Sequence, residues 1–261
     1  MPFNALSTTS SSSHHSKVLL YAHHGWGKTF QCRHYQDRFG KGLIISGEAG
    51  LASLGDVEID YIPFNSWDGE INEDEGVYSY RHIWKMVQSA DFKKAGYKWI
   101  CIDSLTELAE RLIEHLEAEH ADSNNGFAMW GDYARIMNGV LKAIRDMPCH
   151  VYITCLAKEE KDPNDVTQYW PHVPGQAVGK KIPALFDHVL CGVRVTEKDD
   201  KGVPRVKRYV ASDEVSGWHG KTRDPRQRLK AYEECDDVTE LLHRMAMSDE
   251  DFAKYQQKGS S

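Results

Sequence analysis

The stretch AHHGWGKT, residues 22–29, constrains the fold of this chain more than any other part of the sequence. It follows an apolar run, KVLLYA, that predicts a short strand, and it precedes FQCRHYQDRF, a segment that predicts a helix. Gly25 and Gly27 allow the backbone to turn tightly, so that successive N–H groups at the helix start can converge on an anion. Because a chance GKT in a turn rarely falls between a strand and a helix, the pattern predicts a phosphate-binding loop.

Lys28 and Thr29 carry the contacts expected with ATP and its magnesium ion. Lys28 is expected to neutralise β- and γ-phosphate oxygens, and the Thr29 hydroxyl to bind Mg²⁺. Ala22 stands where this motif usually begins with glycine, which is tolerable if its φ stays negative. The indole of Trp26 is expected to pack against the first helix or against the nucleotide. The expected nucleotide contacts in this segment are His23, His24, Gly25, Trp26, Gly27, Lys28, Thr29 and Phe30.

A second apolar run, KWICIDS at 98–104, predicts a strand that ends in Asp103. A carboxylate at the end of a strand beside the first one can accept a hydrogen bond from a water molecule on Mg²⁺. Taken alone, Asp103 is better explained as the cap of the helix that follows at Thr106. Together with the GKT segment, it predicts the second half of a nucleotide and Mg²⁺ site.

Strands and helices alternate along the chain through residue 157. The expected strands cover 17–22, 42–47, 57–64, 98–104 and 150–157, and the expected helices cover 30–39, 81–96, 106–121 and 133–147. This order predicts an α/β protein with a mostly parallel central sheet flanked by helices. Two further strands, at 186–196 and 203–212, predict a C-terminal antiparallel hairpin.

The composition divides the chain into three parts. Residues 1–16 are rich in Ser and Thr and predict a flexible arm. Residues 17–245 are expected to form one ATPase domain, and residues 246–261 a polar tail. The long polar segment 158–182 is expected to be a loop within the domain.

The composition also predicts a soluble protein of the cytoplasm that does not bind a membrane. No apolar run approaches the length needed to span a bilayer, and the six cysteines form no CxxC pair, which favours reduced thiols. The net charge is −7, yet 13 of the 32 Lys and Arg lie in residues 180–230, against 7 of the 39 Asp and Glu. This asymmetry leaves room for a polyanionic partner.

The order of the motifs YAHHGWGKT, LIISGEAG, ICIDSLTEL, HVYITCLAK and HGKTR resembles that of RecA-like phage ATPases, including phage nucleotide-binding proteins and single-strand annealing recombinases. The resemblance spans residues 17–245. It implies a RecA-like P-loop core that binds ATP and Mg²⁺, hydrolyses ATP, assembles into a ring or filament and acts on single-stranded DNA in the host cytoplasm. A single-strand-binding protein is a candidate partner.

The resemblance also implies roles for residues outside the P-loop. Glu48 follows the second strand, as the catalytic glutamate of RecA-like proteins does, and would polarise the attacking water. Thr154 or Cys155 would sense the γ-phosphate from the central strand, although RecA carries a polar amide pair there and a buried strand residue explains either position equally well. Lys221 and Arg223 resemble a basic pair that enters the neighbouring subunit's site. Solvated loop residues remain the alternative for Glu48 and for the basic pair.

The segment 158–182 falls where RecA-like proteins carry a DNA-binding loop. Rings can stack on bases, and ammonium groups can follow phosphates. The candidate residues are Lys158, Lys161, Tyr169, Trp170, Lys180 and Lys181. Acidic neighbours in the same segment make a plain surface loop about as reasonable.

Two other functions remain open from the sequence. A nucleotide-dependent assembly or switch protein would use the same P-loop without DNA-stimulated turnover. A small-molecule kinase would need an acceptor pocket and an arginine-rich lid over the phosphates, and the sequence shows no clear lid.

Overall fold

The computed structural model describes residues 15–48, 50–69, 71–72, 74, 78–122 and 126–258. The flexible arm expected at 1–16 therefore lies outside the described residues, apart from His15 and Ser16.

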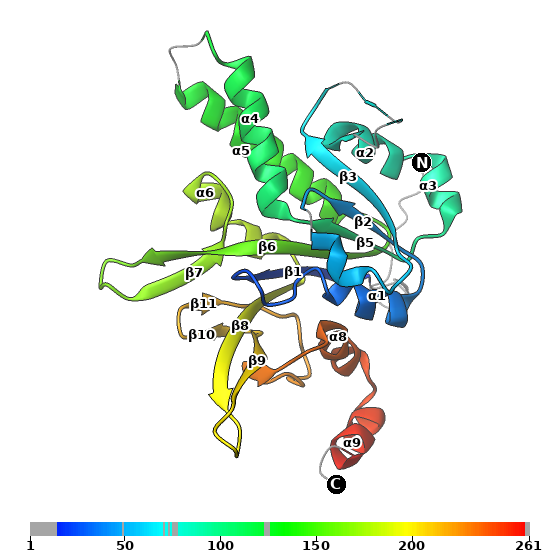
Figure 1. Cartoon of the computed structure of the whole chain (residues 1–261), viewed down its shortest axis with the longest axis vertical. Helices are drawn as coiled ribbons and strands as arrows, with labels where there is room; N and C mark the ends of the chain where they lie inside the picture. Colours follow the sequence, from blue (N-terminus) through cyan, green and yellow to red (C-terminus); the bar gives the residue numbers. More distant parts are fainter. Residues whose placement is uncertain are drawn as a thin grey trace, which may run out of the picture.

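A single large sheet forms the centre of the molecule (Figure 1). Its parallel strands lie in the order β8 (His188–Lys198), β1 (Lys17–Ala22), β6 (His150–Lys161), β5 (Trp99–Asp103), β2 (Gly42–Ser46), β3 (Asp60–Ser66) and β4 (Tyr78–Ser79). Beyond β8, the antiparallel strands β9 (Pro204–Ala211) and β12 (Tyr232–Glu234) extend the sheet. The predicted fold class and the C-terminal hairpin are confirmed. The strand that ends in Asp103 is not beside the first strand, however, because β6 lies between them.

Helices cover both faces of this sheet. Figure 1 shows α1 (Gln31–Phe39) and α8 (Val238–Ala246) on one side and α4 (Leu105–Glu119) and α5 (Gly126–Arg145) on the other. In β1, Val18, Leu20 and Ala22 pack into the core under α1 and α8. Leu19 and Tyr21 pack into the core under α4 and α5. A central parallel strand buried on both faces has to be apolar throughout, and each fully buried Leu contributes about 1.5–3 kcal/mol.

The segment 81–96 forms two helices rather than the single helix expected. α2 (Tyr80–Val87) ends before Ser89, and α3 (Ala90–Ala95) begins after it. Ser89 has extended backbone angles, and its side chain accepts a hydrogen bond from the backbone N–H of Phe92. This N-cap interrupts an otherwise helical pattern of apolar residues.

The segment 158–182 is not a loop. β6 continues to Lys161, and the chain turns and returns as β7 (Thr167–Pro171), followed by α6 (Gln176–Gly179) and α7 (Ile182–Leu185). β7 also pairs with β11 (Trp218–His219), which pairs with β10 (Glu214–Val215). The aromatic residues expected on a loop therefore belong to a small sheet that continues from the central strand.

The C-terminal segment is attached to the rest of the protein. The segment 246–261, predicted as a polar tail, contains the helix α9 (Asp249–Lys258). A short 3₁₀ helix, η1 (Gly50–Leu54), lies elsewhere, between β2 and β3. The buried guanidinium of Arg228 bonds to the Asp249 carboxylate at 2.6 Å and lies 4.8 Å from the centre of the Phe252 ring. No helix within the described ranges is long and apolar enough to cross a membrane.

One buried and one half-buried histidine predict a loss of stability in mild acid. Burial lowers the pKa of His188 and of His150 to about 4, from an ordinary value of 6.5. The unfolded chain therefore takes up protons below about pH 6.5 that the folded chain does not accept until about pH 4, so stability falls as the pH falls through this window. Thermal melting of the whole chain from pH 7 to 5 should show a decreasing Tm.

The variant His188→Gln should make this decrease shallower, whatever its melting temperature at pH 7. The exposed His243 gives a matched control, since His243→Gln should keep the wild-type slope. Equal slopes for all three proteins would exclude His188 as a source of the pH dependence.

Candidate functional site

The predicted phosphate-binding loop connects β1 to α1 with the geometry that its sequence requires. Gly25 and Gly27 have φ values of 74° and 99°, in the left-handed region that favours glycine. Ala22 ends β1 and is not among the residues with positive φ, as its replacement of glycine requires. The hydroxyl of the buried Tyr152 donates to the Lys28 carbonyl at 2.7 Å and holds the end of the loop in place.

The side chain of Lys28 points back into the hollow of its own loop. Its ammonium donates to the carbonyls of Ala22 and His23 at 3.1 and 3.2 Å. Burial lowers the pKa of this ammonium, while the nearby carboxylates of Glu48 and Asp103 oppose the shift. Among the described residues, the hydrogen bonds of this buried cation go to neutral carbonyls. A phosphate group would bind it more strongly, because a charged acceptor forms stronger hydrogen bonds than a neutral one.

Two hydroxyl side chains from two other segments meet at the Asp103 carboxylate. The Thr29 hydroxyl donates to one carboxylate oxygen at 2.9 Å, and the Thr154 hydroxyl of β6 donates to the other at 2.5 Å. Burial raises the pKa of Asp103, and both hydrogen bonds oppose that rise. The cap of α4 is Ser104, whose side chain accepts from the Glu107 N–H. The Asp103 carboxylate is thus turned toward the P-loop rather than into the helix.

The Thr29 and Asp103 oxygens fit a magnesium ion. A hydroxyl and a carboxylate are the hard oxygen donors that Mg²⁺ prefers, and they face each other beside the buried ammonium of Lys28. Mg²⁺ held here would neutralise negative charge on phosphate oxygens. Thr154 is fully buried and its hydroxyl is occupied by Asp103, so here it positions that carboxylate. Contact between Thr154 and a γ-phosphate stays a prediction.

Glu48 lies at the same edge of the sheet, directly after β2. Its backbone carbonyl accepts a hydrogen bond from the Ser46 hydroxyl at 2.9 Å, and its side chain is half-buried. The Glu48 carboxylate opposes the lowering of the Lys28 pKa and adds to the rise in the Asp103 pKa, which places it near both. The carboxyl ends of parallel strands converge in this way, and ligands of open α/β sheets bind there.

The indole of Trp26 packs against β8 and belongs to the same buried cluster as residues of α1. It is 1% exposed, and its N–H donates to the Tyr209 carbonyl of β9 at 3.2 Å. A Cβ atom on Gly192 would lie only 2.8 Å from the indole, so glycine is needed there. Contact between Trp26 and a nucleotide stays a prediction. Phe30, by contrast, is 37% exposed at the start of α1, with the Arg33 guanidinium 4.3 Å from its ring centre.

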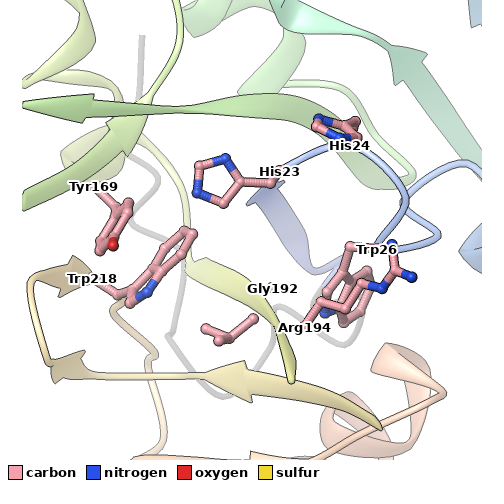
Figure 2. Close-up of a pocket in the computed structure, with 8 residues that line it drawn as sticks. His23, His24, Trp26, Tyr169, Gly192, Arg194 and Trp218 are labelled. Atoms are coloured by element: carbon pink, nitrogen blue, oxygen red, sulfur yellow. The ribbon is translucent and has the colours of Figure 1, made fainter. Parts of the chain in front are cut away.

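A pocket of about 280 Å³ opens beside the first half of the loop. Figure 2 shows Tyr169 and Trp218 on one side of it, Trp26 and Arg194 on the other, and His23 between them. The rings of Tyr169 and Trp218 are stacked, with centres 4.2 Å apart, and the His23 ring meets each of them edge-on at 5.7 Å. His24, Gly192 and Val193 complete the lining.

Two arginines of the β8–β9 hairpin reach this loop, and the sequence reasoning missed both. Arg208 donates from Nε to the Trp26 carbonyl at 2.7 Å. Nη1 of Arg194 lies 2.9 Å from the position that a Cβ on Gly25 would occupy. The hairpin itself was predictable from alternating residues, but which of its faces meets the P-loop is decided by the pairing of β8 with β1.

The basic pair Lys221 and Arg223 lies away from the loop of its own chain. Lys221 pairs through its backbone with Val189, near the amino end of β8, whereas the P-loop lies at the carboxyl ends. The Lys221 ammonium donates to the carbonyls at 183 and 186, at 3.2 and 3.0 Å, and burial lowers its pKa. Arg223 forms an ion pair with Asp187 at 3.2 Å.

The predicted DNA-binding residues lie on the β6–β7 hairpin and directly after it. Lys158 and Lys161 form ion pairs with acidic neighbours at 2.9 and 3.6 Å. The Trp170 and His219 rings are stacked, with centres 3.7 Å apart, and the Lys180 ammonium lies 5.5 Å from the centre of the Trp170 ring. Lys181 is exposed at the start of α7.

Loss of the Thr154 hydroxyl should lower the affinity for Mg²⁺, although Thr154 is not expected to contact the ion itself. Thr154→Val keeps the buried volume but removes one hydrogen bond from Asp103. The Mg²⁺ concentration needed for half-maximal ATP binding should rise by about 10–100-fold, as for other groups that orient a metal ligand. Thr154→Ser keeps the hydroxyl and should stay near wild type, so an equal response of the two variants would refute the positioning role.

Comparison with known proteins supports this assignment of the loop. The family model of the AAA domain matches residues 14–223, and no curated protein matches the chain. The matched region includes the P-loop, Glu48, Asp103 and both strands of the β8–β9 hairpin. The matched region covers most of the 261-residue chain. The chain therefore belongs to the AAA domain family, and its P-loop domain is of the ATPase type.

Proposed function

We propose that this protein binds ATP with Mg²⁺ and hydrolyses it in a cycle linked to single-stranded DNA, as a RecA-like phage protein of recombination or annealing. One observation carries the proposal. The His23 carbonyl accepts a hydrogen bond from the Lys28 ammonium, and the His23 ring contacts the stacked pair of Tyr169 and Trp218. His23 therefore connects a ligand stacked on those rings to Lys28, the lysine that we propose binds the phosphates.

The rings of this pocket suit bases of a single strand. Every base has a flat face that can stack on an aromatic ring, so such contacts need no particular sequence. Lys158 on the β6–β7 hairpin, and Lys180 and Lys181 between α6 and α7, are available to follow the phosphates. Because Lys158 and Lys180 also lie close to Glu160, we expect DNA binding to be weak and strongly dependent on salt.

Glu48 is the residue that we propose orients the attacking water. Its half-buried carboxylate follows β2 and acts electrostatically on both Lys28 and Asp103. Glu48→Gln should bind ATP with wild-type affinity yet hydrolyse it roughly 10²-fold more slowly, the usual contribution of a positioned base. Single-turnover hydrolysis with a parallel binding titration separates the two effects.

An exposed glutamate at the opposite, amino-end edge of the parallel strands provides the control for this measurement. Glu58→Gln, between η1 and β3, should behave as wild type. A wild-type rate for Glu48→Gln would remove Glu48 from the mechanism and leave the nucleotide site itself intact.

The link to DNA is tested by ATP hydrolysis with and without single-stranded DNA at low salt. Stimulation is expected, and Tyr169→Ala should remove most of it, because one base–ring contact contributes about 1–3 kcal/mol. The backbone contacts of Tyr169 survive this change. Tyr255→Ala on α9 is the matched control. Hydrolysis that DNA does not alter, in a protein without DNA affinity, would contradict the proposal.

An assembly function without DNA is the second candidate, and one observation favours it. Phe127 is 91% exposed and Trp130 45% exposed, both on α5, which projects with α4 from the sheet (Figure 1). Apolar side chains in such a position suit contact with another subunit. Sedimentation of the protein with and without ATP and DNA tests this function. Assembly that requires ATP but not DNA would favour it, whereas assembly on DNA would support a ring or filament that acts on single-stranded DNA.

A further inference from the structure

The β8–β9 hairpin brings two arginines directly opposite each other beside the P-loop. β1 ends at Ala22, which pairs with Gly192 of β8, and β8 continues past that point to Arg194. Arg194 pairs with Arg208 of β9 in the antiparallel register. Residues directly opposite in such a register project on the same face of the sheet, and here both guanidinium groups lie at the loop.

The two arginines differ in what they contact. Arg208 donates to the Trp26 carbonyl at 2.7 Å and lies 3.4 Å from the Asp236 carboxylate. Arg194 is exposed and lines the pocket, and its side chain makes no hydrogen bond or ion pair with any residue that the structure describes. Like charges placed directly opposite on neighbouring strands repel each other. An anion at the loop would relieve that repulsion and give Arg194 a partner.

We propose that Arg194 is a catalytic arginine supplied by the same chain, which contacts the terminal phosphates of ATP from the open side of the P-loop. The inference rests on the proposed binding of ATP at this loop. The position of the Arg194 guanidinium explains the choice of ligand: it lies beside Gly25, inside the segment whose N–H groups are expected to cradle phosphates. Arg208 is a positioning residue, because it acts through the Trp26 carbonyl.

The chemistry asked of Arg194 is electrostatic. In hydrolysis, water adds to the γ-phosphorus and its proton passes to the inorganic phosphate formed or to solvent. The bond to the bridging oxygen breaks, and that oxygen keeps the electron pair on ADP. Arg194 neither gives nor takes a proton. Its guanidinium donates hydrogen bonds to oxygens that gain negative charge as the bond breaks, which a fork of fixed N–H donors does well.

This assignment makes the active site complete within one subunit. Lys221 and Arg223, the pair expected to act on a neighbour, lie toward the other end of β8 and bond within their own chain. With Arg194 in place, hydrolysis requires no second subunit to supply positive charge. The specific activity of a dilute protein should therefore not fall as its concentration is lowered.

The experiment compares Arg194→Ala and Arg194→Gln with Arg205→Ala in the full chain. Arg205 lies on the same hairpin and forms an ion pair with Asp199 away from the loop. Binding of fluorescent ATP and ADP analogues is measured with and without aluminium fluoride, together with steady-state hydrolysis. Both Arg194 variants should lose about 10²–10³-fold in kcat, as for loss of one donor to the developing charge.

The binding measurements separate Arg194 from a merely structural role. The Arg194 variants should bind the ADP analogue nearly as wild type does but lose the tightening that aluminium fluoride gives. Arg194→Lys should restore part of it, and Arg205→Ala should change nothing. If the wild-type protein binds ATP but Arg194→Ala and Arg205→Ala behave alike, the inference is overturned and the proposed function still stands.

Two further outcomes would contradict the role of Arg194 or the ATP site itself. The phosphate of a DNA strand in the pocket presents the same chemistry to Arg194. If the Arg194 variants lose affinity for single-stranded DNA while kcat without DNA is unchanged, the guanidinium belongs to the DNA site and the inference fails. If the wild-type protein binds no ATP at all, the proposed function itself fails.

Discussion

The hydrogen bonds from two threonine hydroxyls to the buried carboxylate of Asp103 hold together the segments on which the site depends. The donors come from the P-loop and from β6, and the acceptor ends β5. A carboxylate that is 1% exposed is costly to bury unless its oxygens are bonded. The same contacts that make this burial tolerable therefore fix the P-loop against the central strands. The Thr29 and Asp103 oxygens that make this burial tolerable are also the ones that would hold Mg²⁺.

The other side of the P-loop is fixed by the β8–β9 hairpin. The Trp26 indole lies on Gly192 and bonds to the Tyr209 carbonyl, while Arg208 bonds to the Trp26 carbonyl. Both the side chain and the backbone of one loop residue are thus held by neighbouring strands. A loop fixed in this way keeps its N–H groups oriented before any anion arrives, which lowers the cost of binding.

The fold and the centre of the site could be predicted from sequence because each rests on local patterns. A strand, a glycine-punctuated loop and a helix occur together around Lys28, and apolar runs mark the buried strands. The placement of Trp26 and Arg194 depends instead on the order of strands in the sheet, which no local pattern contains. The segment 158–182 was misread for a related reason: its polar residues alternate on a hairpin that is held by pairing with the distant Trp218.

Gln31, near the start of α1, has a consequence for where this domain ends. Its side-chain amide donates to the Asp236 carbonyl at 2.9 Å and accepts from the Val238 N–H at 3.0 Å. These contacts join the helix that follows the P-loop to the start of α8, beyond residue 223, where the family match stops. A boundary drawn at the end of the match would remove β12 and α8 and uncover one face of the sheet. The folded unit of this chain is longer than the region that the family model matches.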